Sequence, residues 1–318
     1  MTSNNKLLLL DTFYFLHRSF HAYPKDLKSP LGESTNIIFG FAMSLLDSIS
    51  EFNPTHIACG WESEDQPSFR KVLYPKYQIT RAQMEIDDEK LFSEQLPKIV
   101  ELLEAFNIPR LSENGFEGDD VVGTIANIAS ENAKVIISTA DQDLLQLITD
   151  EISVYRPASG QFIKKQLFDE KAFIEKYQFS PRQMIDYKAL RGDPSDNIPG
   201  VKGIGDKGAK SLILEFGELQ KIYDNIENIK SESIKQKLID SKDDAFMSKQ
   251  LATIITNIPM KFNLNDCVVH DFDIDKVRML FNRYGFNSLN KRLDRLELIK
   301  GIKEKEQKYI ENAQQSFL

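Results

Sequence analysis

The sequence predicts an α/β protein with a largely parallel sheet, followed by a helical region. Over the first 175 residues, short apolar runs typical of buried strands alternate with amphipathic stretches. Strands that alternate with helices indicate parallel βαβ units. After about residue 175 the strand pattern fades and helical patterns follow one another. We therefore expect an α/β core at 1–175, a helical region at 176–290 and a charged helical tail or linker at 291–318.

The individual elements follow from this alternation. Four runs bounded by turn residues read as buried strands: 6–12, 55–62, 133–139 and 152–157. Apolar residues at helical spacing predict two helices in the first part of the chain, at 36–50 and 92–106, and a further helix that opens after Glu117. The second part predicts four more, at 180–191, 206–216, 232–240 and 243–255.

The composition is that of a soluble globular protein, with 41% hydrophobic and 28% charged residues. We find neither an apolar run of about 18 residues nor a signal-peptide pattern, so a cytoplasmic location is expected. Two cysteines, Cys59 and Cys267, are too few for a disulfide framework. Each has a histidine three residues away, but in β-like runs that spacing points the two side chains to opposite faces. We expect buried core cysteines rather than a zinc site.

Carboxylates follow the predicted strands at the point where each strand ends. Asp11 follows the first strand, Glu62 the second, and Asp141 and Asp143 the third. In an open parallel sheet, functional groups gather at this carboxyl edge. A further acidic run, Glu117, Asp119 and Asp120 in "GFEGDDVVG", opens the helix that precedes the third strand. Taken alone, that run has a structural interpretation, because acidic residues complement the positive end of a helix.

Four separate places that bring carboxylates to one edge favour a metal site. Like charges at short range raise one another's pKa unless a cation compensates them. No His or Cys is interleaved with the acidic runs, so the ligands are oxygens and the natural guests are Mg²⁺ or Mn²⁺. The carboxylates suffice for two ions, and two ions roughly 3.5–4 Å apart suit phosphodiester hydrolysis.

A glycine-rich turn supplies a fifth place. In "LRGDPSDNIPGVKGIGDKGAKSLILEFG" (190–217), Asp193 and Asp196 flank a turn. "GVKGIG" then leads into a helix, whose exposed backbone N–H groups suit a phosphate. A structural loop is the alternative, but three lysines around the turn favour a nucleic-acid backbone. The predicted contacts here are Lys202, Gly203, Gly205, Lys207 and Lys210.

A second basic segment indicates the same partner. "SFRKVLYPKYQITR" (68–81) contains four basic residues, three aromatic rings and no acidic residue. Basic residues interleaved with rings suit single-stranded nucleic acid, which offers both phosphates and bases. The alternative is a surface loop with a few buried rings. The predicted contacts are Arg70, Lys71 and Tyr77. The net charge of −8 argues only against a protein that coats nucleic acid non-specifically.

In this order the motifs resemble the bacterial 5′-3′ exonuclease family, over roughly residues 6–290. The matching stretches are "LLDTFYFLHRSFHA", "PSFRKVLYPKYQITR", "FEGDDVV", "STADQDLLQL" and "LRGDPSDNIPGVKGIGDKGA". The resemblance implies a PIN-like nuclease core and a helix–three-turn–helix DNA-binding region. It also implies two-metal cleavage of DNA near junctions and 5′ flaps, in primer removal and repair.

The resemblance also assigns roles to residues. It implies that Asp11, Glu117 and Asp119 hold one metal and that Asp141, Asp143 and Asp196 hold the second, with Asp120 and Asp193 as supporting acids. Arg18 matches a basic residue that faces the scissile phosphate. The turn at Gly203, Gly205 and Lys207 grips duplex DNA, and K⁺ is a further cofactor expected there.

Two positions depart from the family pattern. Glu62 stands where an aspartate is usual, and Gln78 stands where many relatives carry a lysine that neutralises the phosphate. Losing one such contact costs on the order of 10²–10³ in rate, and Lys76 or Arg81 is the residue placed to compensate. The sequence thus favours a monomeric 5′ nuclease acting on flaps, junctions and RNA-containing primers. The alternatives are a catalytically weakened junction-binding protein and a PIN-type ribonuclease. The chain has no room for a polymerase, so it is either free-standing or the N-terminal domain of DNA polymerase I.

Overall fold

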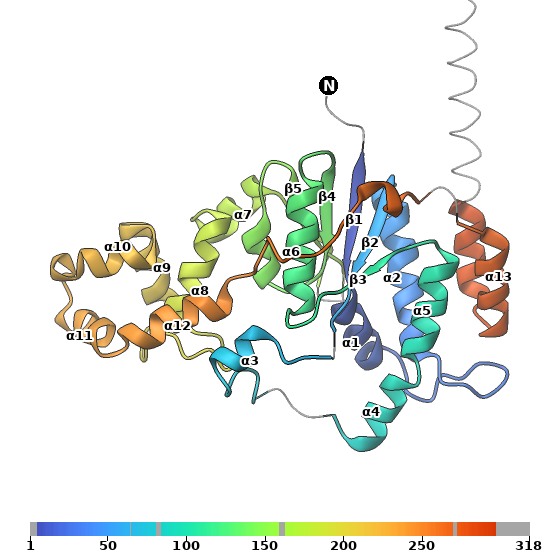
Figure 1. Ribbon diagram of the computed structural model, residues 1–318, viewed down its shortest axis with the longest axis horizontal. Helices are drawn as coiled ribbons and strands as arrows, with labels where there is room; N and C mark the ends of the chain where they lie inside the picture. The colour runs from blue at the N-terminus through green and yellow to red at the C-terminus, as the bar shows by residue number, and fades with distance from the viewer. Residues whose placement is uncertain (1–4, 64, 81–83, 159–162, 270–271, 297–318) are drawn as a thin grey trace, which may run out of the picture. The chain divides into compact units, whose positions relative to one another are not determined.

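The computed structural model describes residues 5–63, 65–80, 84–158, 163–269 and 272–296 (Figure 1). The chain packs into two compact units, and each is described by itself. Unit 1 comprises Met1–Tyr14, Thr55–Glu85 and Pro109–Cys267, and unit 2 comprises Phe15–Pro54, Ile86–Ile108 and Val268–Leu318. Both units are discontinuous along the chain. The predicted domain boundary at residue 175 divides the chain by sequence position, which the two discontinuous units do not test, so it stays a prediction.

Unit 1 contains a six-stranded sheet in the order β3-β2-β1-β4-β5-β6. Its strands are β1 (Lys6–Asp11), β2 (His56–Gly60), β3 (Arg110–Leu111), β4 (Lys134–Ser138), β5 (Ile152–Arg156) and β6 (Gln166–Phe168). The first five are parallel to their neighbours, and β6 is antiparallel to β5. The four predicted strands are confirmed to within two residues at each end. β3 and β6 are too short to leave a periodic pattern in the sequence.

The order of the strands creates a switch point at the centre of the sheet. From β1 the chain moves outward through β2 to β3, and it returns to β4 on the other side of β1. On one face, Leu7 and Leu9 join a buried core with Val121, Val122 and Ile125. Ligands of open α/β sheets bind at the carboxyl ends of the strands beside such a switch point.

The helices of unit 1 include those predicted in the second part of the chain. They are α3 (Phe69–Leu73), α6 (Gly118–Ala129), α7 (Glu170–Tyr177), α8 (Met184–Arg191), α9 (Asp206–Phe216), α10 (Leu219–Asp224), α11 (Glu232–Asp240) and α12 (Lys242–Ala252). Short 3₁₀ turns are η1 (Asp143–Leu147), η2 (Pro181–Gln183), η3 (Ile226–Asn228) and η4 (Leu264–Cys267). The helix predicted at 243–255 ends early, because the chain after α12 becomes an extended strap.

This strap, residues 253–258, runs across α6 (Figure 1). Side chains of the sheet-containing core hold its backbone. Thr124 Oγ1 donates to the carbonyl of Ile255 at 3.2 Å and accepts from the amide of Ile258 at 3.3 Å. Gln146 bonds the backbone on both sides of Thr253 at 3.0 Å each. The backbone groups of the strap are therefore satisfied by side chains rather than by helix or sheet.

Unit 2 is helical. It holds most of α1 (Thr12–Ala22), together with α2 (Asn36–Phe52), α4 (Ile86–Ser93), α5 (Leu96–Ala105) and α13 (Ile274–Arg283). The predicted helix at 36–50 is confirmed. The one predicted at 92–106 is divided, because Pro97 lies in the first turn of α5 and has no N–H with which to continue α4. The buried side chain of Gln95, at the junction, accepts a hydrogen bond from the amide of Ile37 at 3.0 Å. Of the predicted tail, residues 297–318 lie outside the described residues.

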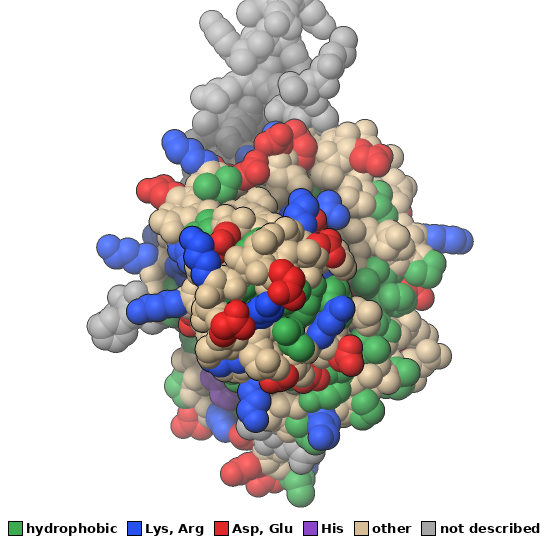
Figure 2. All heavy atoms as spheres, turned by 90° about the vertical axis from the view of Figure 1, so that its left-hand side faces the viewer, with side chains coloured by type: hydrophobic (Ala, Val, Ile, Leu, Met, Phe, Trp, Pro, Cys, Tyr) green, Lys and Arg blue, Asp and Glu red, His purple; other side chains and the backbone are tan. Residues whose placement is uncertain are grey.

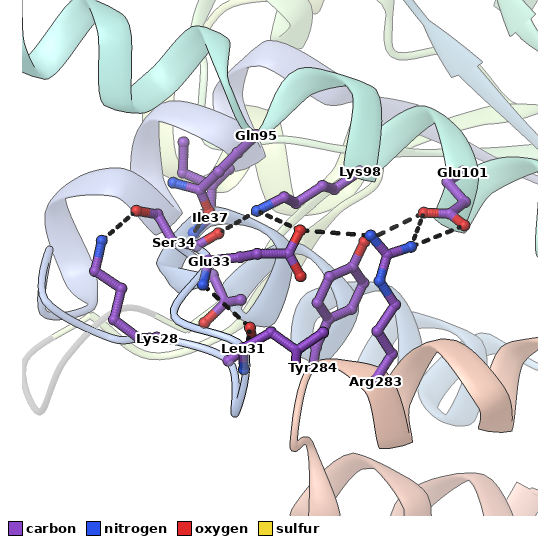
Figure 3. Close-up of polar contacts among 12 residues, drawn as sticks. Lys28, Leu31, Glu33, Ser34, Ile37, Gln95, Lys98, Glu101, Arg283 and Tyr284 are labelled. Atoms are coloured by element: carbon purple, nitrogen blue, oxygen red, sulfur yellow. Dashed lines mark hydrogen bonds and ion pairs between the residues drawn. The ribbon is translucent and has the colours of Figure 1, made fainter.

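A polar network fixes the surface of unit 2 near the end of α13 (Figure 3). Arg283 lies within 3.4 Å of both Glu33 and Glu101, and Lys98 lies 3.7 Å from Glu33. Tyr284 donates to Glu101 at 3.2 Å. Exposed ion pairs contribute little free energy of unfolding, so the network mainly fixes the loop before α2 against α5 and α13. None of the described helices has the length and apolar character needed to cross a membrane.

Candidate metal centre

Carboxylates collect at the carboxyl edge of the sheet, as the sequence predicts. Asp11 is the last residue of β1, Asp141 and Asp143 follow β4, and Glu62 lies two residues beyond β2. Since β1 and β4 are neighbours on either side of the switch point, Asp11 and Asp141 lie where open α/β sheets bind their ligands.

Asp11 is nearly buried and strongly perturbed. Its exposed fraction is 9%. Thr139 Oγ1 donates to its Oδ2 at 2.6 Å, and the amide of Tyr14 donates to Oδ1 at 3.2 Å. Burial raises the pKa of Asp11 to about 6, the charges of Asp141 and Glu62 add to this rise, and the two hydrogen bonds oppose it.

Asp119, at the start of α6, faces the same charges. Burial raises its pKa well above the ordinary value, and Asp141, Asp11 and Glu117 raise it further. Asp11, Glu117, Asp119 and Asp141 therefore form one cluster, which we call the first acidic group. Glu62 is exposed at its margin.

Glu117 is held from the segment that follows β2. Ser68 Oγ donates to its Oε1 at 2.7 Å, and the Tyr77 hydroxyl donates to its Oε2 at 3.1 Å. Tyr77 is only 6% exposed. The prediction that Tyr77 contacts DNA is therefore wrong, because its ring is buried and its hydroxyl orients a carboxylate.

Arg70 and Asp120 also require correction. Asp120 has no exposed surface and Arg70 is 2% exposed. They form a bidentate pair at 2.7 and 2.8 Å, and Asp120 also accepts from the amides of Ile255 at 2.9 Å and Glu117 at 3.2 Å. Four donors occupy the four lone-pair positions of a carboxylate. Asp120 is therefore a structural residue rather than a metal ligand, and Arg70 is an internal counter-ion rather than a DNA contact.

A second acidic group consists of Asp143, Asp193 and Asp196. One carboxylate oxygen from each lies within 4.8 Å of the others. The amide of Asp143 donates to Asp141 Oδ1 at 2.8 Å, so the second group begins beside the first. The family resemblance places Asp141 in this group and Asp193 outside it. The geometry makes Asp193 a full member of this group, and the assignment of Asp141 to the second metal stays a prediction.

The loop that carries Asp193 and Asp196 depends on two glycines. Asp193 and Ile198 exchange both backbone hydrogen bonds, at 2.8 and 2.9 Å, which closes the loop. Its two ends then meet so closely that a Cβ on Gly200 would lie 2.2 Å from the amide nitrogen of Gly192. Both glycines also have positive φ angles, 76° and 62°. Only glycine fits where a backbone approaches at this range.

Lys188, on α8, is a member of the site that sequence reasoning missed. It is 5% exposed, donates to Asp193 Oδ2 at 2.7 Å and pairs with Asp143. Burial acts to raise the pKa of Asp193, but the pair with Lys188 and hydrogen bonds from Ser195 lower it overall. The signal was present in the sequence, because Lys188 lies four residues after Met184 on the buried face of a predicted helix. A lysine there requires a buried anionic partner.

Most of the other predicted contacts lie on the surface of unit 1. Lys71, Lys76, Lys202, Gly203 and Lys207 are exposed. Gly205 precedes the first residue of α9, and Lys210 on that helix is partly buried. Figure 2, seen from the side of α10 and α11, shows Lys and Arg side chains scattered among Asp and Glu. This face therefore carries no continuous basic surface, and the role of the lysines of the turn as DNA contacts stays a prediction.

Two predicted catalytic residues lie elsewhere. Arg18 belongs to the part of α1 in unit 2, so its role stays a prediction, and Arg81 lies outside the described residues. Cys59 and Cys267 are buried free thiols, and burial raises the pKa of each to about 12.

The acidic groups fit divalent cations. All of their donors are carboxylate oxygens, and the pKa values of Asp11 and Asp119 are raised first by burial and then by the charges of neighbouring carboxylates. Hard cations such as Mg²⁺ and Mn²⁺ take such ligands. Each group has one neighbouring cation: Lys188 pairs with Asp143 and Asp193 in the second, and Arg70 lies 3.5 Å from Glu117 in the first.

The family models cover almost the whole described chain. Residues 6–178 match the 5'-3' exonuclease, N-terminal resolvase-like domain, and residues 179–275 match the 5'-3' exonuclease, C-terminal SAM fold. The chain belongs to the 5'-3' exonuclease family. The first model covers the sheet with its acidic edge, and the second covers α8 to α12 with the loop of Asp193 and Asp196.

Curated relatives of the chain are DNA polymerases I. The chain is 35% identical over 294 residues to that of Bacillus subtilis, which covers 92% of the chain and 33% of the polymerase. It is 36% identical over 321 residues to the DNA polymerase I of Caldicellulosiruptor bescii, which covers 98% of the chain and 37% of that polymerase. The chain thus spans about a third of the length of the relatives it matches.

Solved structures share the fold. T5 D15 protein, co-crystallized with metal ions, has a TM-score of 0.65 and 20% identity, covering 93% of this chain and 99% of that one. The catalytic core of Rad2, in complex with DNA substrate, has a TM-score of 0.61 and 16% identity, covering 93% of each chain. Together with the sheet topology, these similarities confirm the predicted mostly parallel α/β core followed by a helical region.

Proposed function

We propose that this chain is a metal-dependent 5′ nuclease that hydrolyses DNA phosphodiester bonds near single-strand/duplex junctions. The observation that carries the proposal is the pair of adjacent acidic groups at the switch point of the sheet. Carboxylates that are gathered at one edge repel one another and lower the stability of the fold. Metal-assisted phosphoryl chemistry explains why a protein would have them there. Membership of the 5'-3' exonuclease family supports the same reaction.

The two groups would hold one divalent cation each, Mg²⁺ or Mn²⁺. Asp11, Asp119 and Glu117 are the proposed ligands in the first group, with Asp141 between the groups. Asp143, Asp193 and Asp196 are the proposed ligands in the second. Such ions supply positive charge that stabilises the phosphate and acidifies water.

The side chains of the protein orient these ligands and the substrate. Ser68 and Tyr77 fix both oxygens of Glu117. The amide of Gln78 donates to the Asp196 carbonyl at 2.9 Å, so the segment with Gln78 lies against the second group. Gln78 itself can donate hydrogen bonds to a phosphate but brings no charge. We propose that Lys76, an exposed lysine on this segment, supplies the positive charge. Arg18 would face the scissile phosphate, as the family implies, and Arg81 would add to the compensating charge.

The proposed substrate is DNA with a 5′ flap, including strands that begin with an RNA primer, bound by a monomer in the cytoplasm. The solved T5 D15 and Rad2 structures include complexes with DNA. Lys71, Lys202, Lys207 and Lys210 are proposed backbone contacts. A K⁺ ion at the Gly203 turn would have to displace Lys237, which donates to the Gly203 carbonyl at 3.0 Å.

The test is cleavage of a 5′-end-labelled flap duplex in Mg²⁺, Mn²⁺ or EDTA. Asp141→Asn and Asp196→Ala should abolish cutting and leave flap binding within a few-fold. The matched control is Asp150→Asn, which removes an exposed carboxylate from the same β4–β5 connection, just before β5. Full activity in Asp141→Asn would refute the ligand assignment, and cutting in excess EDTA would refute the metal mechanism. Cutting of single-stranded RNA alone would favour the ribonuclease alternative.

The second candidate function is a junction-binding protein with weakened catalysis. It is favoured by Gln78, which lies beside the second acidic group without a positive charge. Tight flap binding with no cutting in either metal would support it, and restored cutting in Gln78→Lys would assign the loss to that position.

A further inference from the structure

Two cations meet at the end of β5, outside both acidic groups. Arg156 is the last residue of β5, and Lys176 lies in the last turn of α7. The guanidinium of Arg156 lies 5.7 Å from the ring centroid of Phe168. Lys176 Nζ lies 5.0 Å from the same ring and 5.0 Å from that of Tyr177. The two positive charges therefore share one aromatic surface.

In the part of the chain that the structure describes, these two charges, on Arg156 and Lys176, have no carboxylate in an ion pair with them. Arg156 Nη2 donates to the neutral amide of Gln166 at 2.9 Å, and its buried Nε has no hydrogen-bond partner. Burial lowers the pKa of Lys176, and repulsion from Arg156 lowers it further. By contrast, the buried cations Arg70 and Lys188 each have carboxylate partners. The end of β5 thus has two like charges and one buried N–H group without an acceptor, and an anion bound there would satisfy both.

The cation pair borders the first acidic group. The residues that line a small depression of about 20 Å³ include Arg156, Lys176 and Tyr177, together with Thr139 and Asp141. Its volume admits one water-sized group, which corresponds to a single phosphate oxygen rather than a nucleotide. Lys176 is exposed. An anion would thus approach from the surface, beside the edge where Asp141 lies.

We propose that Arg156 and Lys176 bind one backbone phosphate of the nucleic-acid strand, next to the phosphate that is cleaved. This inference rests on the proposed nuclease function and adds a binding position on the β5–β6 side of the site. Arg156 contributes the charge of its guanidinium and Lys176 a point charge, and the neighbouring rings of Phe168 and Tyr177 exclude water. Charge-assisted hydrogen bonds to phosphate are among the strongest in proteins. Phosphate contacts fix the register of the strand without reading its bases.

The test compares Lys176→Gln with Lys171→Gln, which removes the same charge from the same helix but from an exposed lysine outside the depression. Binding of a fluorescein-labelled flap duplex is measured by anisotropy in EDTA over a range of KCl concentrations. Each phosphate contact contributes about 0.7–0.9 to the slope of log K against log salt. We expect Lys176→Gln to lower that slope by roughly this amount and to weaken binding roughly threefold to tenfold. Lys171→Gln should change neither.

Arg156 is tested in two variants, because it is partly buried. Arg156→Gln should weaken binding as Lys176→Gln does, and Arg156→Lys should recover part of the loss, with melting temperatures recorded for both. In Mg²⁺, loss of a contact made equally in ground and transition states should raise KM and leave kcat nearly unchanged.

The outcomes separate this inference from the function on which it rests. Equal salt slopes for Lys176→Gln and Lys171→Gln in a wild-type protein that cuts flaps would overturn the phosphate site alone. A wild-type protein that neither binds nor cuts flap DNA would overturn both proposals. A fall in kcat with unchanged KM would also contradict a simple phosphate contact.

Discussion

Replacing Arg70 with methionine should destabilise unit 1 strongly. Arg70 makes four hydrogen bonds, two to Asp120 and one each to the carbonyls of Leu251 and Thr253. Methionine preserves most of the volume of the side chain but leaves Asp120 charged and buried, with two backbone amides as its remaining donors. Breaking a buried ion pair from one side costs about 3–5 kcal/mol. For a unit of this size the loss corresponds to a melting temperature roughly 10 °C lower.

The measurement is urea unfolding followed by the fluorescence of Trp61, the single tryptophan of the chain. Trp61 packs in unit 1 against Phe13 at 5.3 Å and Arg110 at 5.1 Å, so it reports on the unit that contains Arg70. Lys71→Met is the matched control, because it removes an exposed cation from the same short helix. The control should change the free energy of unfolding by less than about 0.5 kcal/mol.

Two results would refute this reasoning. One is an Arg70→Met protein as stable as Lys71→Met. The other is strict additivity in the double variant Arg70→Met/Asp120→Leu, because removing both partners of a buried pair costs far less than the sum of the single losses. If Arg70 instead contacted DNA, the salt dependence of flap binding would change and the urea midpoint would not.

Three further predictions concern metal, backbone and thiols. Burial and neighbouring carboxylates raise the pKa of Asp11 from 3.8 to about 6. Between these two pH values the metal-free folded protein binds a proton that the unfolded protein has lost, so its stability falls as the pH rises. The rise in melting temperature on adding Mg²⁺ should thus be larger at pH 7 than at pH 5; calorimetry that shows equal rises would contradict it. Gly200→Ala should abolish cleavage and lower stability, whereas Gly205→Ala, with no atom within 4 Å of its new Cβ, should melt like the wild type. Cys59 and Cys267 should resist a thiol reagent until urea unfolds the protein, and prompt labelling would argue against their burial.

The position of the acidic residues at one edge of the sheet could be predicted from the sequence, because it depends only on which residues follow each strand. Asp11 and Asp141 each follow an apolar run long enough to be read as a buried strand, and parallel strands bring their ends to one edge. Their neighbourhood could therefore be predicted without coordinates. The same reasoning cannot say which carboxylate of an acidic run faces the site.

Asp119 and Asp120 illustrate that limit. They are adjacent at the start of α6, so they point in different directions around the helix. Asp120 points to Arg70, which lies 50 residues earlier, and to the amide of Ile255, which lies 135 residues later. No periodicity links such distant partners. The burial of Tyr77 was hidden for the same reason, because a ring among basic residues looks alike whether it stacks on a base or orients Glu117.

The strap at 253–258 has a consequence for how this protein can be divided. Arg70, Thr124 and Gln146 all lie in the stretch matched by the N-terminal family model, which ends at residue 178, yet each bonds backbone of residues 251–258. A gene cut at that boundary would remove the backbone partners of these three side chains and uncover the face of α6 on which the strap lies. The two segments are thus not interchangeable modules. Native-state hydrogen exchange should find α6 and the strap opening together, as a single cooperative element formed from two segments that lie far apart in the sequence.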